Sequence, residues 1–237
     1  MNFHLKKIWK HKWILRSIVP TIYFNFHYLP IKQAIKLPIL LYKPKLLKCK
    51  GKVIIDTNRT HFGMIRLGEN IVSFYPNTGI TFENLGGNIT FKGKCRIGNN
   101  SALAIGSKGN IIFEDGFQAT TTLHLIGYNQ ITFDTNVLVG WECTFMDTDL
   151  HKLTKLDNKG YSKGYGSIHI GKNNWFGTKC IILKNTQTPD FTTFCAGSII
   201  SGKINAPSYS VIGLNSQLII KKENVYLNLN DDQIKYN

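Results

Sequence analysis

The chain has 237 residues, of which 43% are hydrophobic and 12% are aromatic, so it can bury a core and general disorder is not expected. Its 29 Lys and Arg residues outnumber its 14 Asp and Glu residues and give a formal charge of +15. This excess indicates either a solvated basic surface or attraction to an anion, such as a phosphorylated cofactor or an acidic membrane face. No nucleic-acid-binding motif or basic-aromatic array accompanies it, so no nucleic-acid partner is expected.

Residues 1–50 form the first predicted segment, a helical and aromatic lead-in. Residues 1–19 carry an apolar helix face with basic residues around it, and Pro20 is expected to end the helix. Residues 21–47 are dense in Tyr, Phe, Leu and Lys and are punctuated by prolines. Two roles stay open for this segment. It covers the exposed edge of the body that follows, or it forms a basic amphipathic patch on the anionic inner face of a membrane.

The start of the chain also has the basic character of an export signal. The run after it is interrupted by Pro20 and Pro30 and lacks an A-x-A cleavage site, so export is not expected. No stretch approaches about 18 continuous apolar residues, the length that a membrane span needs. The cysteines are odd in number, scattered and without a Cys-x-x-Cys pair, unlike a secreted disulfide framework: Cys49, Cys95, Cys143, Cys180 and Cys195. We therefore expect a cytoplasmic protein, at most peripheral to the cytoplasmic membrane face.

The body, residues 51–222, repeats an apolar or small residue every six positions. The longest series lies in its second half: Ile170, Phe176, Ile182, Thr188, Phe194 and Ile200. A helix repeats about every 3.6 residues and an isolated strand about every 2. A period of six therefore indicates a β-solenoid, in which short coils stack on a shared core.

A longer repeat defines one coil of this solenoid. Similar five-residue segments begin at Gly87, Gly109 and Asn129, with spacings of 22 and 20 residues. Three hexapeptides account for most of that spacing, and a few loop residues at a corner account for the rest. The sequence therefore predicts an all-β, three-sided solenoid.

The six-residue period stops between Phe145 and Ile168. Residues 146–167 form a polar, Gly-containing insert, and a long loop that leaves a rigid scaffold commonly carries binding or chemistry. After the body, residues 223–237 are predicted to form a C-terminal tail.

Three segments resemble one known family. About residues 87–222 resemble the hexapeptide-repeat acyltransferases, and in particular their branch of sugar O- and N-acetyltransferases, which includes the maltose, galactoside and capsular-polysaccharide enzymes. The most specific matches are FMDTDLHKL (145–153), Ile-Gly-x-x-x-Trp-Phe-Gly-Thr (170–178) and Thr-Phe-Cys-Ala-Gly-Ser-Ile-Ile (193–200). The resemblance implies a left-handed parallel β-helix with an N-terminal helical or irregular segment, and a homotrimer whose active site is shared between neighbouring copies. It also implies acetyl-CoA as the donor, a sugar or oligosaccharide as the acceptor, and no metal.

His151 is the predicted catalytic residue. Acyl transfer to a hydroxyl needs a base, and an imidazole with a usual pKa of about 6.5 is suited to that task. His151 lies in the insert, directly after Asp147-Thr148-Asp149-Leu150. Asp149 is the predicted group that orients the imidazole, with Asp147 or a backbone carbonyl as the alternatives.

The resemblance also implies a set of cofactor contacts. The positions that match the family's contacts to the donor are Thr178, Ala196 and Ser201, with Lys221 as a further contact to its phosphates. This chain departs from the family at that end, since Ser201 is followed by Gly202 rather than by a lysine. For the acceptor, Trp141 is the predicted contact, because an aromatic ring can stack on a sugar face; a bulky corner residue is the equal alternative.

Two other functions stay open at this point. One is a non-catalytic basic solenoid that acts as a scaffold or membrane-surface adaptor. The other is a metalloenzyme similar to the gamma-class carbonic anhydrases, which bind zinc through three histidines. His124, His151 and His169 contain no close pair, so this pattern favours such a zinc site less than acetyl transfer.

Overall fold

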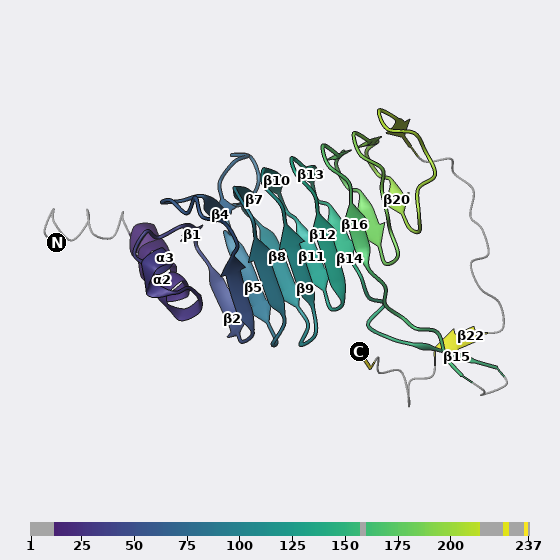
Figure 1. The fold of residues 1–237 in the computed structure, drawn as a ribbon, viewed down its shortest axis with the longest axis horizontal. Coiled ribbons are helices and arrows are strands. Elements are labelled where there is room, and N and C mark those ends of the chain that lie inside the picture. Colours follow the sequence, from purple (N-terminus) through teal and green to yellow (C-terminus); the bar gives the residue numbers. More distant parts are fainter. Residues whose placement is uncertain (1–11, 157–159, 214–224, 228–234, 237) are drawn as a thin grey trace, which may run out of the picture.

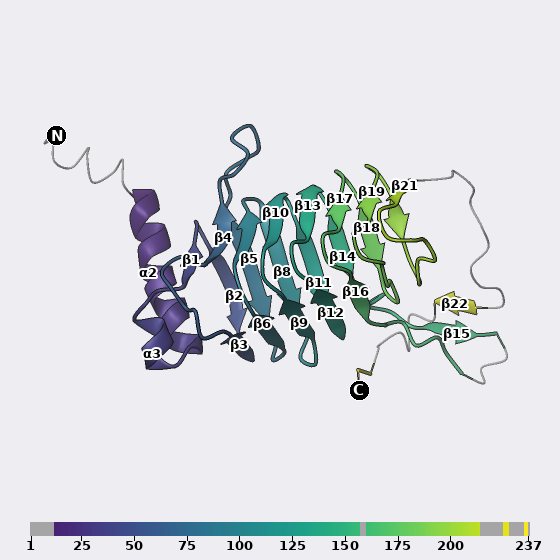
Figure 2. The ribbon, with the colours of Figure 1, turned by 45° about the horizontal axis from the view of Figure 1, so that its top comes forward.

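The computed structural model describes residues 12–156, 160–213, 225–227 and 235–236. Within them the chain winds into a three-sided solenoid, and the strands on each side stack into one sheet (Figures 1 and 2). The pairings within these three sheets are parallel, which confirms the predicted all-β left-handed parallel β-helix. No helix in the described ranges is both long and apolar enough to cross a membrane.

The three sheets are defined by their strands in stacking order. The first sheet contains β1 (Ile39–Leu41), β4 (Ile65–Glu69), β7 (Cys95–Gly98), β10 (Phe117–Thr121), β13 (Leu138–Trp141), β17 (Trp175–Phe176), β19 (Thr193–Phe194) and β21 (Val211–Ile212). The second contains β2 (Lys45–Cys49), β5 (Ile80–Asn84), β8 (Ser101–Ile105), β11 (His124–Gly127), β14 (Thr144–Met146), β18 (Ile181–Leu183) and β20 (Ile199–Ile200). The third contains β3 (Lys52–Ile55), β6 (Asn88–Phe91), β9 (Asn110–Phe113), β12 (Gln130–Phe133) and β16 (Ile168–Ile170).

The core is a column of identical side chains along the solenoid axis. Parallel register places Phe91, Phe113 and Phe133 in one row, with successive ring centroids 5.3 and 5.2 Å apart. All three rings are buried, and each such stacked pair adds about 0.5–1.5 kcal/mol beyond the burial itself. The repeat of 22 and 20 residues in the sequence is therefore one coil of this core.

The N-terminal segment covers the open end of the solenoid with two helices, α2 (Lys12–Tyr28) and α3 (Ile31–Ala34). The sequence predicts a helix that ends at Pro20, but α2 continues through this residue. Pro20 lacks an N–H and crowds the preceding turn. The side-chain oxygens of Ser17, Thr21 and Asn25 accept backbone N–H groups of the segment 39–43 and so hold the helix on both sides of Pro20.

The solenoid also begins before residue 51, the predicted start of the body. β1 pairs with β4 and β2 pairs with β5 in parallel register, so residues 39–49 already form two sides of the first coil. Pro38 and Pro44 flank β1 and hide the six-residue period there. All five cysteines lie in the described residues and are free.

The polar insert folds back on itself as a projecting arm, which we define as residues 147–167. Antiparallel bridges join Thr148 to Tyr165 and Thr154 to Tyr161. β15 (Leu153–Lys155), within the arm, pairs antiparallel with β22 (Val225–Leu227) of the C-terminal tail. In Figures 1 and 2 the arm stands away from the stacked coils, with β15 and β22 at its outer part.

Candidate functional site

His151 is exposed on the arm, between the end of β14 and the start of β16. Hydrogen bonds between the two strands of the arm flank His151 on both sides. The Asp149 N–H donates to the Gly164 carbonyl at 2.6 Å, the Ser162 N–H donates to the Leu153 carbonyl at 2.8 Å, and the Leu153 N–H donates to Ser162 Oγ at 3.0 Å. A general base must be held in place to act, and this hairpin supplies that support from a loop.

Asp147 anchors the base of the arm to the solenoid. Its side chain is fully buried, and its two oxygens accept the N–H groups of Tyr128 and Asn129, both at 2.8 Å. Burial raises the pKa of the Asp147 carboxyl to about 6, against the opposing effect of these N–H groups. Both oxygens bind the preceding coil, so Asp147 serves as a structural anchor of the arm; its alternative role as the orienting group for His151 stays a prediction.

Asp149 ties the arm to the following coil. Its exposed carboxylate forms an ion pair with the Lys184 ammonium, which follows β18. The predicted hydrogen bond from the His151 ring N–H to the Asp149 carboxylate stays a prediction, and the ion pair with Lys184 also holds this carboxylate. Sequence reasoning did not identify Lys184, because its partner lies 35 residues away.

Ser201 lies at the same corner of the solenoid. Ile181 pairs with Ile199 and Ile182 with Ile200, so continuing this register places Ser201 beside Leu183, next to Lys184. Asp149 and Ser201 therefore lie at the corner between the second and third sheets, and His151 follows Asp149 by two residues on the arm. Lys221 lies outside the described residues.

The other predicted residues lie at the opposite edge of the second sheet. Trp141, Thr178 and Ala196 occupy the corner between the first and second sheets in three successive coils. Thr178 Oγ1 donates to the Trp141 carbonyl at 3.0 Å, and the Gly197 N–H donates to the Thr178 carbonyl at 2.8 Å. A strand rises about 3.3 Å per residue, so roughly 15 Å separates the two corners within one chain.

Between the two corners the second sheet presents a largely apolar strip, interrupted by the outward His124 of β11. The outward side chains of β8, β14, β18 and β20 are apolar or small and at least partly exposed: Ala102, Ala104, Thr144, Met146, Ile181, Leu183 and Ile199. This strip can cover an apolar chain or another protein surface without leaving a buried charge unpaired.

A loop that sequence reasoning missed reaches the Trp141 corner. Residues 70–79, between β4 and β5, stand out beyond the coils in Figure 2. The rings of Phe74 and Tyr75 contact Trp141 edge-on, with centroids 5.2 and 5.8 Å away. Tyr75 Oη donates to Glu142 Oε1 at 2.5 Å. The sequence signal that could have identified this loop is the aromatic pair Phe74-Tyr75 at a place where the six-residue period is interrupted. With Trp141 still 37% exposed, the three rings form an aromatic surface that can receive a sugar.

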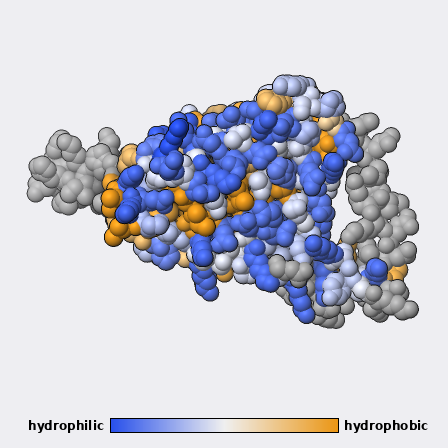
Figure 3. Space-filling view, in the orientation of Figure 1, coloured by the Kyte–Doolittle hydropathy of each residue, from blue (hydrophilic) through white to orange (hydrophobic). Residues whose placement is uncertain are grey.

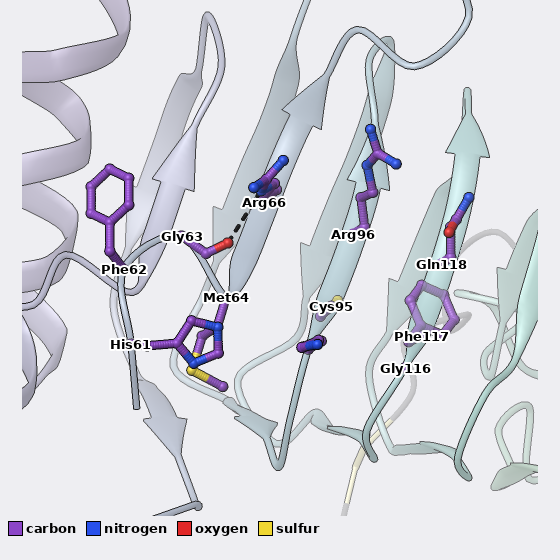
Figure 4. Close-up of a pocket in the computed structure, with 11 residues that line it drawn as sticks. His61, Phe62, Gly63, Met64, Arg66, Cys95, Arg96, Gly116, Phe117 and Gln118 are labelled. Atoms are coloured by element: carbon purple, nitrogen blue, oxygen red, sulfur yellow. Dashed lines mark hydrogen bonds between the residues drawn. The ribbon is translucent and has the colours of Figure 1, made fainter. Parts of the chain in front are cut away.

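Two cavities among the described residues lie on other faces of the solenoid. One of about 500 Å³ lies on the first sheet, where Figure 4 shows Arg66, Arg96 and Gln118 on neighbouring strands. Its two arginines share Glu69, at 3.1 and 2.6 Å, which reduces its net charge. Another of about 570 Å³ includes His169 and Lys203. Neither of these two cavities contains His151 or Trp141.

The histidines face different sides of the solenoid. His124 points outward from the second sheet and His169 from the third, and His169 Nε2 lies 3.2 Å from Asp134 Oδ2. His151 is on the arm. Within the described residues no three His, Cys, Asp or Glu side chains converge as a metal site, so a single chain does not assemble the three-histidine arrangement of the carbonic anhydrase alternative.

Comparison with known proteins identifies two relatives from Staphylococcus aureus. The chain is 32% identical over 162 residues to "Putative acetyltransferase SAV2555" of strain Mu50 / ATCC 700699 and, equally, to "Putative acetyltransferase SA2342" of strain N315. Each alignment covers 54% of this chain and 78% of the relative. No family model and no solved structure matches the chain significantly.

Proposed function

Because this chain belongs to the acetyltransferase family of these two relatives, we propose that it is an acetyl-CoA-dependent O-acetyltransferase for a sugar hydroxyl. The proposed setting is cytoplasmic assembly of a surface polysaccharide or lipopolysaccharide. One observation carries the proposal: the arm, held by a buried carboxylate and a hairpin, displays His151 where the solenoid period breaks. A non-catalytic scaffold does not need a hydrogen-bonded arm that presents an imidazole.

The proposed reaction uses His151 as a general base. The imidazole takes the proton of the sugar hydroxyl while the hydroxyl oxygen attacks the thioester carbonyl. The C–S bond then breaks, and the proton held by His151 passes to the departing thiolate of coenzyme A. Asp149, paired with Lys184, is the residue that we propose steadies the imidazole. The substrate acetyl-CoA supplies both the acyl group and the leaving group, so no further reactant is required.

The Trp141 corner suits the donor. Ala196 is exposed, and nothing lies within 4 Å of the position that a Cβ on Gly197 would occupy. Small residues at consecutive corners let an extended chain such as pantetheine approach the backbone. Since this corner lies roughly 15 Å from the corner at which the arm leaves the solenoid, we propose a homotrimer in which the arm of one copy meets the Trp141 corner of the next.

The test is a steady-state acetyl-transfer assay on His151→Ala with acetyl-CoA and sugar acceptors. We expect turnover to fall by about 10²-fold or more, while circular dichroism and the elution volume stay those of the wild type. His61→Ala, an exposed histidine near the other end of the chain, is the matched control and should keep full turnover. Full activity of His151→Ala would show that the catalytic assignment is wrong.

A further inference from the structure

Helix α2 buries Phe24 in the core, but a row of polar side chains beside it also faces the solenoid. Ser17, Thr21 and Asn25, spaced four residues apart, point at the edge strand β1. Their side-chain oxygens accept the N–H groups of Lys43, Leu41 and Ile39 at 3.0–3.1 Å, and Asn25 Nδ2 donates to the Ile39 carbonyl at 2.7 Å. The helix thus satisfies the open edge of the first sheet with hydrogen bonds.

The outward face of α2 is consequently apolar. Its exposed large residues are Ile18, Val19, Ile22, Tyr23 and Phe26, and the same end of the molecule adds Ile31, Ile35 and Phe62. We call these eight residues the end patch. Val19, Ile31 and Phe62 are 62%, 70% and 67% exposed, and Figure 3 shows hydrophobic residues gathered at this end. Single exposed apolar residues are ordinary, but a contiguous group marks an interaction surface.

Charge is segregated to the same end of the chain. All fourteen Asp and Glu residues lie at or after Asp56. Twelve of the 29 Lys and Arg residues precede it: Lys6, Lys7, Lys10, Lys12, Arg16, Lys32, Lys36, Lys43, Lys45, Lys48, Lys50 and Lys52. Of these, Arg16, Lys32 and Lys36 are exposed within the two helices or directly after them, beside the end patch.

We propose that the end patch docks the protein onto the surface of an anionic lipid bilayer. Apolar side chains on one helix face, bordered by basic residues with no acidic residue in the segment, are what an interfacial helix presents to lipid. A second copy of this chain would bring like charges together across the contact, whereas anionic headgroups complement them. The described helices are not long and apolar enough to cross, so α2 lies in the plane of the interface.

The experiment is sedimentation of the full-length protein with vesicles of phosphatidylcholine alone or mixed with phosphatidylglycerol. We expect binding to the anionic vesicles, and a loss when salt rises from roughly 0.05 to 0.5 M. Val19→Ser/Phe26→Ser removes apolar area without touching Ser17, Thr21 or Asn25, and should weaken binding at least about tenfold. Arg16→Glu/Lys32→Glu should weaken binding by a similar factor through charge alone.

The matched control is Tyr209→Ser/Val211→Ser, which removes two comparably exposed apolar residues at the other end of the solenoid, and it should bind vesicles like the wild type. The proposal is overturned if the wild type does not bind anionic vesicles, or if the end-patch variant binds them as tightly as the control. It is also overturned if ultracentrifugation shows that the end patch drives self-association instead. Acetyl transfer to a water-soluble acceptor, measured on the same variants, separates this outcome from a failure of the proposed function.

Discussion

The stacked coils and the arm of residues 147–167 are held together by different forces. In the coils Phe113 and Phe133 are 0% exposed and stack within one apolar column. The arm is held by backbone hydrogen bonds, the buried carboxylate of Asp147 and the ion pair of Lys184 with Asp149. Apolar burial is cooperative along the whole solenoid, whereas these polar links are local. The coils therefore account for most of the stability, and the arm carries the proposed chemistry.

The largest effect is expected in the coils. Phe113→Ala leaves a cavity against the rings of Phe91, Phe117 and Phe133, and should lower the free energy of unfolding by about 3–5 kcal/mol. The measurement is chemical denaturation followed by circular dichroism. Phe74→Ala, a phenylalanine that is 71% exposed, is the control and should change stability by no more than about 0.5 kcal/mol. Equal effects of the two changes would contradict the buried column.

A smaller, local effect is expected at the base of the arm. Asp147→Ala removes the acceptor of the Tyr128 and Asn129 N–H groups, which should cost about 1–3 kcal/mol. Hydrogen exchange should report this loss in the arm and in the turn at residues 128–129, with little change in β17 or β19. Turnover should fall as well, because His151 loses its support. Loss confined to the distant coils would contradict the role of Asp147 as the anchor.

The sequence predicted the coils better than the arm, for a physical reason. In a parallel solenoid each coil repeats the register of the last, so Phe91, Phe113 and Phe133 repeat in the sequence as they do in the core. The break in that period located His151. Neither the contact of Phe74 with Trp141 nor the pairing of β15 with β22 has a periodic signal, because each joins segments far apart in the chain.

Which face of α2 meets the solenoid was not predicted, for a related reason. An apolar helix face is normally the buried one, and Pro20 normally ends a helix. Here the partner is an open strand edge that needs hydrogen-bonding groups, so Thr21 and Asn25 face inward. A sequence pattern shows which residues share a face but not what that face meets.

The pH dependence of stability gives a further test of the anchor. The pKa of Asp147 is about 6 in the folded chain and near 3.8 without burial, so the folded state binds a proton first as pH falls. This group therefore makes folding more favourable on going from pH 7 to pH 5, by about 1 kcal/mol. The measurement is the difference in unfolding free energy between wild type and Asp147→Asn at the two pH values, since the variant cannot titrate there. A difference that stays constant would show that the folded pKa is not raised.

The smallest effect is expected at the ion pair between the arm and the next coil. Lys184→Ala leaves Asp149 without its cation, but the pair is partly exposed, so the loss should be below about 1 kcal/mol and should shrink with added salt. Lys172→Ala breaks a comparable pair with Asp190, at 3.3 Å, away from the arm. Hydrogen exchange of the arm should therefore quicken in Lys184→Ala and stay unchanged in Lys172→Ala. If neither variant loosens the arm, its backbone hydrogen bonds and Asp147 alone hold His151 in place, and Asp149 is available to the imidazole without competition from Lys184.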